Sequence, residues 1–160
     1  ITRPAKFFAN MPRDGGLAGP LTFAALNVSI GTLLHVAFVR VTGIGTLSGA
    51  ILLGLITCAF LPLFGNLCHL AAKRLQGIGS HEASMRVVAY QSVVSLGSWL
   101  PEVGVLLAAY AVYMTAIGME KVHRLSLLRA VAAVSAGLVA SVAIAAALIV
   151  AVVLFAGIAT

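Results

Sequence analysis

The chain has 160 residues, 61% of them hydrophobic and 9% charged, and its ten Lys and Arg residues outnumber four Asp and Glu residues, for a net charge of +6. A water-soluble domain of this length needs many more polar residues on its surface, so the composition excludes an ordinary soluble protein. The cations are scattered between apolar runs and form no basic face, so we expect no nucleic-acid partner. One compact membrane domain is the predicted organisation.

Residues 1–20 are predicted to form an N-terminal interfacial segment. Phe7, Phe8 and Met11 follow spacings of three and four, which favour a short helix lying in the membrane interface. An irregular lead-in is the alternative. The cations spread through this segment are atypical of a secretory signal. Because the chain begins at Ile1 rather than Met, we expect further residues before it.

Residues 21–160 are predicted to form a transmembrane domain of five helices, at about 21–39, 44–72, 84–100, 103–119 and 130–158. A helix of about 20 apolar residues rises far enough to cross the hydrocarbon core, which is about 30 Å thick. The predicted fold class is therefore all-α: a polytopic membrane protein with a five-helix transmembrane bundle and a short N-terminal interfacial helix.

The third predicted span is the most polar, because amide and hydroxyl side chains lie inside it. Such groups need hydrogen-bond partners in a membrane, so we expect this helix to face protein more than lipid. Gln91 and Ser95 are candidate helix-packing or partner contacts. Gly45 and Gly49 form a Gly-x-x-x-Gly pair and are further candidates, although such pairs are common by chance in glycine-rich membrane proteins.

The distribution of cations predicts the orientation. Five spans place nine of the ten cations on one side and leave only Arg40 on the other. Positive loops stay in the cytoplasm, so we expect a cytoplasmic N-terminus and a C-terminus on the opposite side. The alanine-rich, lysine-poor composition indicates a bacterial inner membrane. The nine cations are Arg3, Lys6, Arg13, Lys73, Arg74, Arg86, Lys121, Arg124 and Arg129.

Some of these cations are also candidate contacts for anionic lipid head groups. Ordinary topology signals explain the same charges, and both interpretations are kept. The candidates are Lys73, Arg74, Arg86, Lys121 and Arg124.

No group of residues predicts catalysis. Cys58 and Cys68 are ten residues apart, or roughly 15 Å along a helix, so they cannot form a disulfide with each other and are interpreted as small packing residues. His35 lies inside the first span, where a neutral histidine bonded to a neighbouring helix is favoured over a pathway residue. The histidines show no metal-ligand spacing, and we find no cofactor signature. We therefore expect no enzyme activity, no metal and no cofactor.

The order of several short motifs resembles the Ypt-interacting protein (Yip) domain family, in particular its prokaryotic members. The resemblance covers most of the chain, and none of its motifs is catalytic. It rests on Pro4, Phe7-Phe8 and Met11-Pro12 before the first span, on residues 86–90, on Trp99-Leu100-Pro101-Glu102-Val103-Gly104, and on residues 117–123 followed by Ser126 and Arg129-Ala130.

The resemblance implies five spans, a cytoplasmic N-terminus and no known enzymatic activity. Eukaryotic members are similar to trafficking adaptors that engage prenylated small GTPases, but this sequence lacks their Asp-Leu-Tyr-Gly-Pro element, so GTPase binding is not implied. The functional hypothesis is a non-catalytic scaffold or accessory subunit that contacts membrane lipids and other membrane proteins. The alternative is a small transporter or channel component, suggested by His35, Pro62 and the polar third span.

Overall fold

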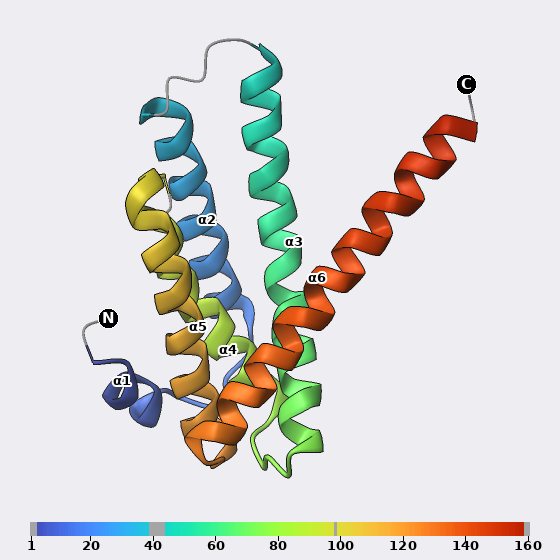
Figure 1. Ribbon diagram of the computed structural model, residues 1–160. Coiled ribbons are helices and arrows are strands. Elements are labelled where there is room, and N and C mark those ends of the chain that lie inside the picture. Colours follow the sequence, from blue (N-terminus) through green and yellow to red (C-terminus); the bar gives the residue numbers. More distant parts are fainter. Residues whose placement is uncertain (1–2, 39–43, 98, 159–160) are drawn as a thin grey trace.

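The computed structural model describes residues 3–38, 44–97 and 99–158. Helices make up most of this part of the chain and no strand occurs in it, so the predicted all-α fold is confirmed (Figure 1). The elements are α1 (Pro4–Asn10), α2 (Ala18–Phe38), α3 (Ile44–Arg74), α4 (His81–Gln91), the 3-10 helix η1 (Ser92–Gly97), α5 (Pro101–His123) and α6 (Leu127–Ile158).

Four of the described helices, α2, α3, α5 and α6, are long and apolar enough to cross a membrane. Several continue beyond the ends expected from hydropathy: α3 ends at Arg74 and α5 at His123, while α6 begins at Leu127. In α3 and α5 the cations that end the apolar run lie in the last turn of the helix, where they interact favourably with the carbonyl end of the helix dipole. Their alkyl chains can also lie along apolar surface while the charge reaches water.

The third predicted span is not one α-helix. It is formed by α4 and η1, which rise about 17 Å and about 12 Å at the usual advance per residue. At one end, the Ile78 amide before α4 donates to the His123 carbonyl at 3.2 Å. At the other end, Trp99 stacks on Phe38 at the end of α2, with ring centroids 4.7 Å apart. The two pieces together therefore run between the same two ends of the molecule as α2.

The change from α4 to η1 coincides with two serines that bond to the backbone. The Ser92 hydroxyl donates to the Ala89 carbonyl at 2.6 Å, and the Ser95 hydroxyl donates to the Ser92 carbonyl at 2.7 Å. Side chains that bond to carbonyls of the preceding turn compete with the regular α-helical pattern. The tighter helix also lies against α2, where a Cβ on Gly31 would overlap the Ser95 carbonyl oxygen.

The least hydrophobic helix lies at the centre of the bundle. Every α4 residue from Ala83 to Ala89 is buried, and so is Gln91. Helix α4 contacts α2, α3 and α5, which surround it in Figure 1. The expectation that this segment faces protein rather than lipid is therefore confirmed, and its polar composition follows from that position.

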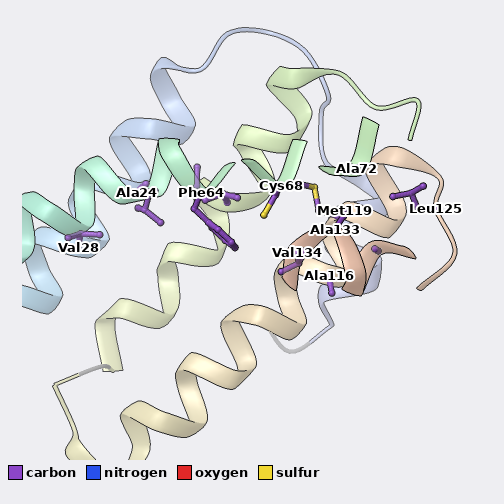
Figure 2. Close-up of a cluster of buried hydrophobic side chains, with 14 residues drawn as sticks. Ala24, Val28, Phe64, Cys68, Ala72, Ala116, Met119, Leu125, Ala133 and Val134 are labelled. Atoms are coloured by element: carbon purple, nitrogen blue, oxygen red, sulfur yellow. The ribbon is translucent and has the colours of Figure 1, made fainter. Parts of the chain in front are cut away.

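A layer of buried apolar side chains joins α2, α3, α4, α5 and α6 around this centre. Figure 2 shows Phe64, Cys68, Met119 and Val134 converging from three helices. Cys68 is fully buried and unpaired, as expected for a packing residue.

The short N-terminal helix is confirmed as α1, but its apolar face meets protein. Phe8 and Met11 are buried in a second cluster with residues of α4 and α5. The Phe7 ring makes an edge contact with Tyr90, with ring centroids 5.5 Å apart. The face that the sequence analysis assigned to the membrane interface therefore packs mainly against the bundle.

Helix α6 has two different halves. Its first half buries Ala130, Ala133, Val134 and Ser141, and it crosses α3 closely. After Ser141 the helix leaves the bundle, as Figure 1 shows, and its described side chains are exposed or half-buried on all faces.

Candidate functional site

The connection between α3 and α4 ends in a well-formed helix start. Ser80 has extended backbone angles, and its hydroxyl accepts a hydrogen bond from the Ala83 amide at 3.2 Å. Glu82 places a negative charge in the first turn of α4, where free amides favour it. This start fixes the direction in which α4 enters the bundle.

Three histidines from different elements gather beside this connection. We call His69, His81 and His123 the histidine cluster. The His69 ring lies 5.3 Å from the His81 ring and 5.4 Å from the His123 ring, measured between centroids. Ser84 Oγ lies 3.0 Å from His69 Nδ1 and 2.7 Å from His123 Nε2, so it joins two of them. His81 Nε2 lies 2.6 Å from the Asn66 amide oxygen.

The protonation of His123 follows from its backbone partner. The Gly79 amide donates to His123 Nδ1 at 3.1 Å, so that nitrogen carries no proton. The neutral ring then carries its proton on Nε2 and donates it to Ser84 Oγ. In this tautomer the Ser84 hydroxyl accepts from His123 and donates to the Ser80 carbonyl at 3.1 Å, so it joins the ring to the start of α4.

The connection fits around His123 because it contains glycine. A Cβ on Gly77 would lie 2.6 Å from His123 Nδ1, and one on Gly79 would lie 2.9 Å from the Val122 carbonyl oxygen. Neither distance leaves room for a side chain. The close approach lets one fully buried imidazole join the α3–α4 connection to α4 and to the end of α5.

An ion pair on α4 holds the segment that follows α1. Arg86 donates to Glu82 at 2.9 Å and to the Gly16 carbonyl at 2.8 Å, while the Gly16 amide donates to Glu82 at 2.7 Å. Gly15 and Gly16 have φ angles of +115° and +88°, which disfavour residues with a Cβ. The paired side chains therefore close a ring of hydrogen bonds on a turn that only glycine adopts easily.

A cavity of about 480 Å³ lies further along the bundle. We call it the Gln91 cavity, since that amide is its most polar group. Its walls come from α2, α3, α4, η1, α5 and α6 and are mostly apolar, with hydroxyls of Thr57, Ser92, Ser95 and Thr115 among them. The size falls within the usual range of small-molecule sites, about 300–1,000 Å³.

A second cavity of about 240 Å³ lies between α2, α3 and η1. His35 lines it, together with Thr32, and it shares Val28, Thr57 and Ser95 with the Gln91 cavity. The ionisable residue that the sequence analysis noted in the first span is therefore a half-buried wall residue beside a space. Within the described part of the chain, no group of three or more His, Cys, Asp or Glu side chains is arranged to hold a metal ion.

The predicted packing residues lie in different surroundings. Gln91 and Ser95 line cavities at the centre of the bundle. Nothing lies within 4 Å of a Cβ built on Gly49, and the side-chain surroundings of Gly45 fall outside the described part. A contact of this glycine pair with another protein stays a prediction.

The predicted head-group cations also divide into two kinds. Arg86 is buried and bonded within the chain, so its structural partner is the N-terminal segment rather than a lipid. Lys73, Arg74 and Arg124 are exposed, while Lys121 pairs with Glu120 at 2.7 Å. Lipid contact by the exposed cations stays a prediction.

A family model described as the Yip1 domain matches residues 1–159. The chain belongs to the Yip1 domain family. Comparison with curated proteins found no match, and neither did comparison with solved structures. Three of the motif residues on which the sequence resemblance rested make structural contacts in this Yip1 domain: Arg86 and Tyr90 hold the N-terminal segment, and Gly118 lies against Val87 where α5 crosses α4.

Sequence reasoning found no metal-ligand spacing among the histidines and did not bring His123 to His69 and His81. The missing signal was the glycine spacing in Gly77-x-Gly79, which leaves room for a ring from elsewhere in the chain.

Proposed function

We propose that this Yip1-family membrane protein is a non-catalytic scaffold or accessory subunit of a larger membrane assembly. The observation that carries the proposal is the second half of α6, which leaves the bundle and whose described side chains, up to residue 151, are exposed or half-buried on all faces. Val139, Val142 and Leu148 are 69%, 56% and 61% exposed. A helix with so little intramolecular contact offers a second membrane helix access to several of its faces.

One face of this half-helix suits close contact. Ala143, Ala147 and Ala151 recur every four residues and therefore lie on one side of the helix. Small residues at this spacing let two helix backbones approach closely in a membrane, where packing rather than the hydrophobic effect drives association. The proposed partner is a membrane protein that presents a similar small-residue helix.

The test is purification of the tagged protein from its native membrane in mild detergent, followed by mass spectrometry. We expect a stoichiometric membrane-protein partner, and we expect Ala147→Phe to reduce its recovery about tenfold because the ring separates the helices. Ala132→Phe is the matched control, since Ala132 is also exposed but lies on the half of α6 beside the bundle. Its partner recovery should equal that of the unmodified protein.

A lone protein or clean homo-oligomer, unchanged by Ala147→Phe, would contradict the scaffold proposal. That outcome would favour the alternative, a small transporter that uses the connected cavities lined by His35 and Gln91.

The proposal includes an orientation in a bacterial inner membrane. The end that holds the α3–α4 connection also carries Lys73, Arg74, Lys121 and Arg124, and Arg13 donates to the Lys121 carbonyl there at 3.4 Å. This cationic end faces the cytoplasm in the proposal, in keeping with the positive-inside rule. The chain then crosses five times, with α4 and η1 together as the third crossing.

A further inference from the structure

The Gln91 cavity is elongated and open at its side. Along α5 its walls run from Gly104 to Thr115, about 16 Å at the usual rise of a helix. Ala108 and Val112 line the cavity and are also exposed, so the space reaches the lipid-facing surface of the bundle. A molecule dissolved in the bilayer can therefore enter without passing through water.

The most buried polar groups of this cavity lie at one end of it. Gln91, Ser92 and Thr115 line it where α4 passes into η1, whereas Gly104 and Leu107 mark the other end. The Ser92 and Thr115 hydroxyls donate to carbonyls of their own helices, at 2.6 Å and 2.8 Å. Neither hydroxyl therefore has a hydrogen atom left to donate to a molecule in the cavity.

Gln91 differs from its neighbours. The residue is 8% exposed, and no hydrogen bond between described residues involves its side-chain amide, which is accessible from the cavity rather than sealed in the core. An amide offers two N–H donors and a carbonyl acceptor, and leaving them unpaired in an apolar environment is costly. The cavity is the space onto which this amide opens.

The walls restrict the chemistry of an occupant. None of the described residues that line the Gln91 cavity is charged, and a charge at this depth in a membrane would be expensive. The apolar walls from α3, α5 and α6 suit a hydrocarbon chain. We propose that the Gln91 cavity binds an uncharged single-chain molecule from the bilayer, with a hydroxyl or carbonyl group hydrogen-bonded to the Gln91 amide and its chain lying along α5.

This site is independent of the scaffold role, because the cavity lies inside the bundle and the proposed partner face lies on the second half of α6. A failure of partner purification would leave the ligand proposal standing, and the reverse also holds.

The test uses two photoreactive probes, a diazirine-bearing hexadecan-1-ol and the matched hexadecane without the hydroxyl. The purified protein in lipid nanodiscs is irradiated with each probe, and labelled peptides are located by mass spectrometry. We expect the alcohol to label walls of the cavity on α3 and α5 about tenfold more than the alkane, as one buried hydrogen bond implies, with unlabelled hexadecan-1-ol as competitor.

Gln91→Met keeps the length of the side chain and removes its hydrogen bonds. This variant should be labelled by the alcohol probe only as much as by the alkane probe. Labelling by the alkane probe should stay unchanged, and that result shows that the cavity is intact. Ala111→Phe places a ring in the cavity and should abolish labelling by both probes, whereas Ala109→Phe, on an exposed face of the same helix outside the lining, should not. Equal labelling by the two probes in the unmodified protein, or labelling that survives Ala111→Phe, would overturn the proposal.

Discussion

Replacing Gly137 by valine is expected to lower the free energy of unfolding by about 1–3 kcal/mol or more, the cost of forcing extra atoms into a packed core. A Cβ at this position would lie 2.5 Å from Cys68 Sγ and 2.9 Å from the Cys68 backbone nitrogen. The sulfur can rotate away, but the α3 backbone cannot move without separating α3 from α6. Each kcal/mol should lower the melting temperature by roughly 2–4 °C for a chain of this size.

Gly49→Val is the matched control. It also replaces glycine by valine, but in α3, at a position where no atom lies within 4 Å of the added Cβ. Thermal unfolding followed by circular dichroism in detergent micelles compares the two variants with the unmodified protein. If both variants melted at the same temperature, close packing of α3 on α6 at Gly137 would not be a source of stability.

Removing the His123 ring is the second change with a large expected effect. In His123→Ala the Gly79 amide loses its acceptor, while Ser84 loses one of its partners and keeps the Ser80 carbonyl and His69. Each buried polar group left unpaired costs about 1–3 kcal/mol, and the space left by the ring adds to this, so the sum is about 2–5 kcal/mol. The α3–α4 connection should open first, because the ring is what joins it to α5.

Hydrogen exchange measures this opening at individual amides. We expect the Ile78 and Gly79 amides to exchange roughly 10–100 times faster in His123→Ala, since each factor of ten corresponds to about 1.4 kcal/mol. His81→Ala is the control: His81 is exposed, and its described hydrogen-bond partner is Asn66 on α3. Equal exchange rates in the two variants would show that His123 does not hold the connection.

The membrane class and helical fold followed from composition because the lipid solvent requires apolar helices over most of the chain. The position of α4 was also predictable. A segment with Gln91 and several serines between apolar spans is stable in a membrane only where protein surrounds it, and α4 is buried on all sides from Ala83 to Ala89.

Other features depend on contacts between distant residues, which hydropathy does not report. Arg86 was grouped with the candidate lipid contacts because a topology rule counts every cation between spans in the same way, whatever its tertiary contacts. Its guanidinium in fact donates a hydrogen bond to the Gly16 carbonyl, 70 positions earlier. The division of the third span into α4 and η1 depends on hydroxyl bonds to carbonyls and on close packing at Gly31, neither of which alters the hydropathy of the run. The buried apolar face of α1 was assigned to the interface for the same reason.

The most direct test of the central claim, that the polar α4 and η1 together cross the membrane inside the bundle, is the side from which two introduced cysteines react. Ile78→Cys and Glu102→Cys are made with Cys58 and Cys68 replaced by alanine, and an impermeant maleimide is added to right-side-out membrane vesicles. Ile78 is 63% exposed, whereas the neighbouring Gly77 has no room for a side chain. We expect labelling at position 102 in sealed vesicles, and at position 78 only after they are opened. Labelling of both positions from the same side would contradict the crossing, and the reverse pattern would retain the crossing but invert the orientation.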